Sequence, residues 1–108
     1  MSFTIEDMIL TGEKKYEMKF LAGQNGWANS ISWVHLLEDT TIIQNFWGKE
    51  LAVTTGLGFP QKEDWMNLAR KLNRYHASGL IINVGQYINE IPEEVRAYCD
   101  ENDLPLLT

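Results

Sequence analysis

The sequence has little cysteine, proline or histidine and no long apolar run. Its single cysteine, Cys99, cannot form an internal disulfide, so a reducing compartment is expected. No stretch is long and apolar enough for a membrane span. The first ten residues, MSFTIEDMIL, are acidic and lack the basic start and apolar core of a signal peptide. These absences predict a soluble domain of the cytoplasm.

Basic residues are also scarce. Lysine and arginine total 9 against 15 aspartates and glutamates, which gives a formal net charge of -6. The densest positive spot is Lys14 with Lys15. Phosphate backbones and anionic membranes are bound mainly by lysine and arginine, so this balance disfavours both partners. We expect DNA contact only through a further domain, and no contact with a membrane.

What is present indicates a folded α/β domain. The 108 residues are 44% hydrophobic, which fits one domain, residues 1–108, with a core of its own. Short apolar runs at 50–56, 80–84 and 104–107 are typical of buried strands. Helical patterns lie between them, at 62–76 and from Pro92 to Asp103. This β-α-β-α-β order over residues 50–108 predicts a small three-layer domain with a mainly parallel sheet.

Local signals give these helices a direction and an inner face. Trp65, Leu68 and Leu72 recur at helical spacing, and Gly79 is expected to end the first helix. Pro92 suits the first position of the second helix. Its inner face is predicted to contain Val95, Tyr98 and Cys99.

The first half predicts an N-terminal α+β portion. Thr4 is typical of a helix cap, residues 17–21 and 30–34 alternate like strands, and 23–26 suit a tight turn. Residues 40–47 predict a short helix. This half either extends the sheet or covers it.

Known chemical motifs are weak. Gly56 and Gly58 follow a strand, but Gln61 occupies the third glycine position of a dinucleotide loop. His35 and Glu38 are spaced for a metal on a helix but lack a third ligand, so a surface or capping role is favoured. Cys99 is expected to be an apolar filler. We therefore expect no catalytic set, no enzyme, no metal and no cofactor.

Polar residues follow the buried strands where a parallel sheet ends. In open α/β sheets this carboxyl edge is the usual place for a ligand, and threonine and asparagine side chains both donate and accept hydrogen bonds. The alternative is that these residues only form strands and turns. The candidate ligand site comprises Thr54, Thr55, Gly56, Asn83 and Gly85, with His35 and Glu38 if the strand at 30–34 joins the sheet.

Four tryptophans are many for 108 residues. Trp65 is assigned to the core. Trp27 and Trp47 flank predicted turns, where they either complete the core or form a patch for another subunit. With Phe46 they form a candidate interface, and a homodimer is expected.

Several segments together resemble a known family. They are Trp33-Val-His35 with Glu38, the run from Gly48 to Gly56 (GKELAVTTG), the strand from Gly79 to Gly85, Ile91-Pro92 and Leu104-Pro105. In this order and spacing, from about Ile5 to Thr108, they resemble the N-terminal domain of purine catabolism regulatory protein-like (PucR-like) transcriptional regulators.

The resemblance implies the regulatory part of a bacterial transcription factor whose helix-turn-helix lies near its far C-terminus. The chain would then be a piece of a longer regulator. We expect the domain to sense a small polar metabolite, with a purine-pathway intermediate as the candidate. The alternative is a protein–protein interaction or dimerisation module that binds no small molecule.

Overall fold

The computed structural model describes residues 3–16, 18–84 and 90–108. These residues form three α-helices, two 3-10 helices and five strands. In chain order they are α1 (Ile5–Tyr16), β1 (Phe20–Ala22), η1 (Gln24–Gly26), β2 (Trp33–Leu36), η2 (Thr41–Asn45), β3 (Glu50–Thr54), α2 (Lys62–Arg74), β4 (Gly79–Ile82), α3 (Glu93–Glu101) and β5 (Leu106–Leu107).

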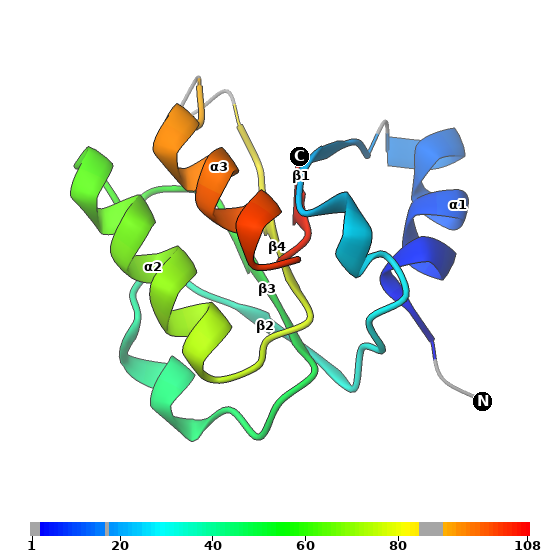
Figure 1. Ribbon diagram of the computed structural model, residues 1–108, viewed down its shortest axis with the longest axis horizontal. Helices are drawn as coiled ribbons and strands as arrows, with labels where there is room; N and C mark the ends of the chain where they lie inside the picture. Colours follow the sequence, from blue (N-terminus) through cyan, green and yellow to red (C-terminus); the bar gives the residue numbers. More distant parts are fainter. Residues whose placement is uncertain (1–2, 17, 85–89) are drawn as a thin grey trace.

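The strands form one sheet in the order β1-β5-β4-β3-β2. Strands β2, β3, β4 and β5 are parallel to their neighbours, and only β1 is antiparallel, against β5. Helices α2 and α3 lie together on one face, and α1 lies on the other (Figure 1). The α/β class and the mainly parallel sheet of residues 50–108 are therefore confirmed.

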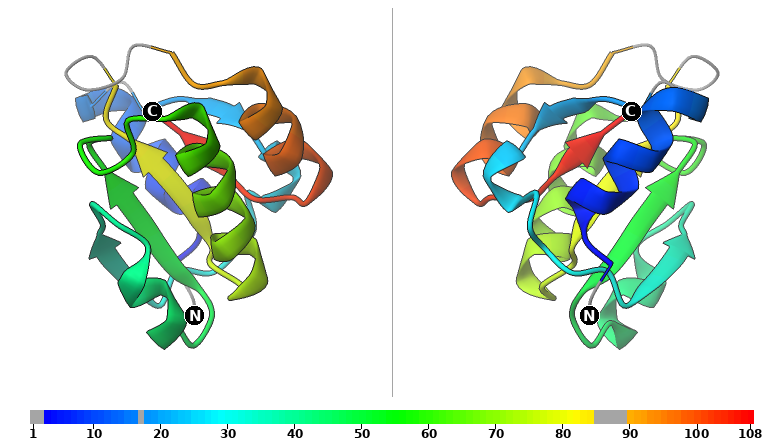
Figure 2. Two further views of the ribbon diagram at one scale, coloured as in Figure 1. Left: turned by 90° about the vertical axis from the view of Figure 1, so that its left-hand side faces the viewer. Right: turned by 90° about the vertical axis from the view of Figure 1, so that its right-hand side faces the viewer.

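The larger core lies between the sheet and helices α2 and α3. Helix α2 buries Trp65, Leu68 and Leu72, each at most 2% exposed, because their spacing places them on one side of the helix. The Asp64 carboxylate accepts the backbone N–H of Gln61 at 2.9 Å, which satisfies a free donor at the start of the helix. Helix α2 connects β3 to β4, and α3 connects β4 to β5. Figure 2 shows both helices lying over the sheet.

Helix α1 forms the smaller core on the opposite face. Its Ile5 and Ile9 pack with Leu51 and Leu107 from the sheet. Thr4 begins the helix as predicted: its hydroxyl oxygen accepts the N–H of Asp7 at 3.2 Å, and the Asp7 carboxylate accepts the N–H of Thr4 at 3.0 Å. The N-terminal half therefore both extends the sheet, through β1 and β2, and covers it, through α1.

Two predicted helix boundaries were wrong. Gly79 does not end α2; it is the first residue of β4, where an added Cβ would lie 3.1 Å from the Pro105 carbonyl oxygen and 3.2 Å from an Ile5 side-chain atom. The glycine therefore permits close packing. Pro92 is the N-cap of α3 rather than its first residue, since its ψ of 139° is extended.

The predicted strands of the first half were displaced along the chain. The strand expected at 30–34 is β2 at Trp33–Leu36, and the one expected at 17–21 is β1 at Phe20–Ala22; Glu17 lies outside the described residues. The helix expected at 40–47 is the short η2. In β2 the side chains of Val34 and Leu36 lie on the α1 face of the sheet and are exposed, because α1 does not extend over them.

Replacing Ile5 with alanine tests the packing of α1. Ile5 is 0% exposed, and a cavity of this kind costs about 2–5 kcal/mol. We expect Ile5→Ala to lower the free energy of unfolding in urea by that amount. The control is Leu10→Ala on the same helix, where the side chain is 60% exposed and the expected change is within about 0.5 kcal/mol. Equal effects of the two variants would show that α1 is not docked as described.

Candidate functional site

The carboxyl edge of the sheet contains a cluster centred on Glu38. Glu38 lies just after β2, and its carboxylate accepts hydrogen bonds from the loop after β3. The Thr55 backbone N–H and hydroxyl donate to Oε1 at 3.1 and 2.9 Å, the Thr54 hydroxyl donates to the same oxygen at 3.4 Å, and the Gly58 N–H donates to Oε2 at 3.3 Å. One carboxylate therefore joins the ends of two neighbouring strands.

The loop is shaped to bring these donors to Glu38. An added Cβ at Gly58 would lie 1.3 Å from the Glu38 carbonyl oxygen, so only glycine allows this approach. Burial raises the pKa of the Glu38 carboxyl group, but the hydrogen bonds from Thr55, Gly58 and Thr54 outweigh it and leave the pKa below its usual value. The carboxylate is thus ionised at neutral pH.

The structure brings together most of the predicted ligand-site residues. Glu38, Thr54 and Thr55 are in contact, and the Asn83 backbone N–H donates to the Thr54 carbonyl at 2.9 Å. Gly56 follows at the turn, with a φ of 92°. The ligand role of these residues stays a prediction. The contacts around Glu38 show a structural role, because its carboxylate oxygens already accept donors from this chain.

One predicted member is not part of this cluster, and another lies outside the described residues. His35 lies within β2, where its ring stacks on Phe46 with centroids 5.0 Å apart and an angle of 26°. It is on a strand, so it does not share a helical face with Glu38, and the metal pairing considered for a helix does not form. Gly85 lies outside the described residues. Among those residues, no three histidine, cysteine, aspartate or glutamate side chains gather to hold a metal ion.

A cavity of about 330 Å³ opens at the opposite, amino edge of the sheet. Its walls come from the segments that lead into β3, β4 and β5 and from the loop after η1. The lining is mostly polar. It comprises Asn29, Ser30, Lys49, Asn73, His76, Ala77, Ser78, Asn102, Asp103 and Leu104.

The backbone of this cavity is unusual at three positions. Lys49, His76 and Asp103 are the non-glycine residues of the described chain with positive φ, at 69°, 60° and 52°. All three line the cavity. Such a conformation is disfavoured for residues with a Cβ, although histidine and aspartate tolerate it better than most.

The ends of α2 and α3 explain two of these conformations. After α2, the N–H of His76 donates to the Asn73 carbonyl and the N–H of Ala77 to the Leu72 carbonyl. After α3, Asp103 and Leu104 donate in the same way to Asp100 and Cys99. This is the Schellman arrangement, whose left-handed position is usually glycine.

Both helices thus direct their C-terminal ends toward the cavity. A helix C-terminus carries partial negative charge, and Asp103 adds a carboxylate. Lys49 brings a positive charge to the same walls. The Asn29 amide already donates to the Ser78 carbonyl at 3.2 Å, and the Asn73 amide donates to the Tyr98 hydroxyl and to Asn102 Oδ1 at 3.1 and 3.2 Å. The side chains that the walls present to a small polar molecule are therefore chiefly those of Lys49, His76 and Asp103.

The sequence matches the purine catabolism regulatory protein-like (PucR) family over residues 9–108. The chain belongs to this family. The match includes both edges of the sheet, and it identifies a domain associated with regulators of this kind, as the resemblance predicted. A comparison with curated proteins finds no match.

The three residues of the predicted interface of this PucR domain differ in exposure, and the interface stays a prediction. Trp47 is 97% exposed and Trp27 is 48% exposed, but Phe46 is only 8% exposed. Phe46 belongs to the larger core and contacts His35, because the η2 turn folds it under the sheet edge. Trp33, assigned to no role from the sequence, is 65% exposed.

Cys99 of the PucR domain is the apolar core residue that the sequence predicted. Cys99 is fully buried, and burial, with a smaller effect of the Asp100 charge, raises the pKa of its thiol to about 12. It is therefore a core residue with little thiolate. Within the described ranges, no helix has the length and apolar character needed to cross a membrane.

The cavity residues were missed by sequence reasoning, although a signal existed. Both helices of the second half end without a glycine at the position where a left-handed residue is needed. His76 and Asp103 occupy those positions. A helix that ends without glycine and leads at once into a buried strand indicates a residue with a side chain in a left-handed conformation.

Replacing Glu38 with glutamine tests the carboxyl-edge cluster. A glutamine side chain has one acceptor oxygen and no charge, so we expect Glu38→Gln to lower the free energy of unfolding by about 1–2 kcal/mol at pH 7. Since the pKa of Glu38 is lowered in the folded state, its contribution is present above the usual value of 4.5 and is lost as the pH falls through the folded value. Urea titrations of both proteins from neutral to acid pH should converge; a constant difference would contradict the assignment.

Replacing the two left-handed residues with glycine tests the strain at the amino edge. We expect His76→Gly and Asp103→Gly each to raise the free energy of unfolding by about 0.5–1 kcal/mol, because glycine adopts positive φ without a steric penalty. Asn67→Gly, at an exposed position within α2, is the control and should lower it by about 0.2–0.5 kcal/mol. Destabilisation by all three would show that the two side chains contribute more than their backbone conformation costs.

Proposed function

We propose that this PucR-family domain is a regulatory module that binds a small polar molecule, without transforming it, in the amino-edge cavity. The observation that carries the proposal is the cavity itself. Its volume of about 330 Å³ lies at the lower end of the range of small-molecule sites, about 300–1,000 Å³. Its walls combine a lysine, a histidine, a carboxylate and several amides.

The backbone strain around the cavity supports the same proposal. Residues in disfavoured conformations cluster at functional sites more often than elsewhere, and here three of them surround one cavity. At His76 and Asp103 a glycine would fit the helix ends with less strain. A side chain that is kept at such a position is available to contact a ligand.

The chemical class of the ligand follows from the lining. Lys49 favours a carbonyl or an anionic oxygen, and the Asp103 carboxylate, at the end of one of the two helices, favours an N–H or an amine. A compact, hydrogen-bonding molecule with both kinds of group fits these walls. Nucleobases and other intermediates of purine breakdown have this character, and the family to which the chain belongs directs the search to them.

The binding experiment is designed to distinguish the two edges of the sheet. Nucleobases and purine-degradation intermediates would be tested by calorimetry against the wild type, and any compound that binds would then be tested against paired variants. For the cavity we expect Lys49→Met and Asp103→Asn to weaken binding by about 1–3 kcal/mol. Asparagine preserves the left-handed backbone at 103, so the change isolates the charge.

Thr55→Val and Asn83→Leu are the matched variants at the carboxyl edge. They should leave the affinity unchanged if the ligand occupies the amino-edge cavity. Loss of binding in these two alone would place the ligand where the sequence predicted it and overturn the cavity assignment. If no compound of a broad metabolite panel binds, the domain is not a sensor of such molecules.

A further inference from the structure

Strand β2 forms an uncovered edge of the sheet. It pairs with β3 on one side, and within the described residues no strand pairs with its other side. Trp33, Val34 and Leu36 are 65%, 55% and 71% exposed. With Trp47, which is 97% exposed, they form the surface named here the β2 edge.

The exposed side chains of β2 lie on both faces of the sheet. Val34 and Leu36 are in register with Leu51 and Val53 of β3, and Leu51 packs in the core beneath α1. These two side chains therefore extend the α1 face of the sheet beyond the helix. Trp33 is in register with Glu50 and so lies on the other face.

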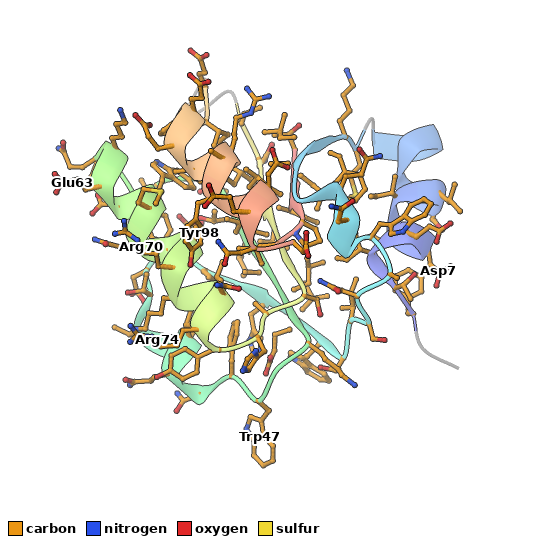
Figure 3. The ribbon with its side chains drawn as sticks, in the orientation of Figure 1. Asp7, Trp47, Glu63, Arg70, Arg74 and Tyr98 are labelled. Carbon is orange, nitrogen blue, oxygen red and sulfur yellow. The ribbon has the colours of Figure 1, made fainter. Side chains whose placement is uncertain are left out.

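Trp47 lies in the turn before β3, three residues before Glu50, which is in register with Trp33. The Glu50 carboxylate accepts the backbone N–H groups of Trp47 and Gly48 at 2.7 and 2.8 Å. The Ser32 hydroxyl donates to the carbonyl of Lys49 at 3.2 Å, which ties the turn to the start of β2. Figure 3 shows the Trp47 side chain pointing away from the body of the molecule. A fixed turn thus presents a fully exposed indole.

The β2 edge lacks the devices that keep edge strands apart. Natural edges are commonly protected by lysine, proline or inward-pointing charges. The segment 30–37 (SISWVHLL) contains neither proline nor a formally charged side chain. In a chain of net charge -6, this neutral segment is a place where two acidic molecules can meet with little repulsion.

The exposed side chains supply a large part of the area that a stable dimer needs. Each of the two tryptophans offers on the order of 150–250 Å², the valine and leucine add to this, and a standard interface buries about 800 Å² on each partner. An edge strand that pairs with its own copy in antiparallel direction forms a two-fold symmetric contact in which each residue meets the same surface. The free backbone groups of β2 supply the hydrogen bonds of that contact.

We propose that two copies of this chain associate through β2, antiparallel about a two-fold axis, so that Trp33, Val34, Leu36 and Trp47 of each copy cover those of the other. The two sheets then form one continuous sheet of ten strands, twice the five of each chain. The valine and leucine side chains of the two copies lie on the same face, where cross-strand apolar pairs stabilise a sheet. This inference does not depend on a ligand.

Sedimentation velocity on the full 108-residue chain tests the proposal. We expect the wild type to change from monomer to dimer between about 1 and 300 µM. Leu36→Lys should weaken the dimer about a hundred-fold or more, because each copy would then bury an unpaired ammonium group in an apolar contact. Trp47→Ser should weaken it about ten-fold or more. Both side chains are exposed in the monomer, so circular dichroism should show an unchanged fold.

Leu10→Lys is the matched control, since Leu10 is a leucine of similar exposure, 60%, on α1. It should leave the dimer affinity within about two-fold of the wild type. A wild type that stays monomeric at the highest concentration would overturn the proposal. So would a dimer that Leu36→Lys leaves intact or that Leu10→Lys weakens equally.

Cross-linking gives a second, independent measurement. The buried Cys99 thiol, with its pKa raised to about 12, reacts slowly, so a cysteine placed on the surface is the reactive one. Val34→Cys should be captured as a covalent dimer by a short bismaleimide, and Leu10→Cys should not. Equal capture of the two, or capture of Leu10→Cys alone, would contradict a contact through β2.

Discussion

The handedness of the β3-α2-β4 and β4-α3-β5 crossovers determines which face of the sheet the helices cover. Strands β3, β4 and β5 are parallel and follow one another in the sheet. Because β-α-β crossovers have the same hand, two successive crossovers in one direction put both helices on one face. The other face is left to the N-terminal segment, which has a single helix of 12 residues. Val34 and Leu36 are exposed because this one helix does not cover the whole face.

The same topology gives the two edges of the sheet different characters. At the carboxyl edge, a carboxylate from the β2 side closes on the β3 loop through Glu38, Thr55 and Gly58. At the amino edge, two helices end against the strands they precede, and the Schellman arrangement turns the chain within a few residues. Residues of these turns, His76 and Asp103 among them, line the polar cavity, which lies at the edge where open α/β sheets less often bind ligands.

Much of the second half could be predicted because its signals are local. The spacing of Trp65, Leu68 and Leu72 defines a buried helical face whatever surrounds it, and the run at 50–56 defines a strand. Glu38 was predicted to reach the edge near Thr54 and Thr55 on the condition that the Trp33 strand joins the sheet. The strand does join it, and Glu38 contacts both threonines. The offset of the first-half strands has a physical origin: their burial depends on which helix covers them, and alternation alone does not contain that information.

The remaining features depend on tertiary context. Phe46 and Trp47 are adjacent in sequence and equally apolar, yet one is buried and the other fully exposed. Their difference is set by the turn that Glu50 fixes. The cavity residues are likewise brought together from four segments distant in sequence. Apart from the helix ends that lack glycine, no residue type marks them, since an asparagine or lysine at a loop is ordinary until the opposing loop is known.

One short segment is shared by the cavity and the β2 edge. The N–H of Lys49, in the cavity wall, donates to the His76 carbonyl at 2.8 Å, and its own carbonyl accepts the N–H of Ser32 at 2.8 Å. Two residues earlier in the chain, Trp47 is exposed at the β2 edge. If a ligand binds Lys49 and two copies meet at Trp47, both events act on the same three-residue turn. A coupling between them is then reciprocal: a ligand that strengthens the dimer must bind the dimer more tightly than the monomer by the same factor. In a regulator, that linkage is sufficient to convert the concentration of a small molecule into the association state of two subunits.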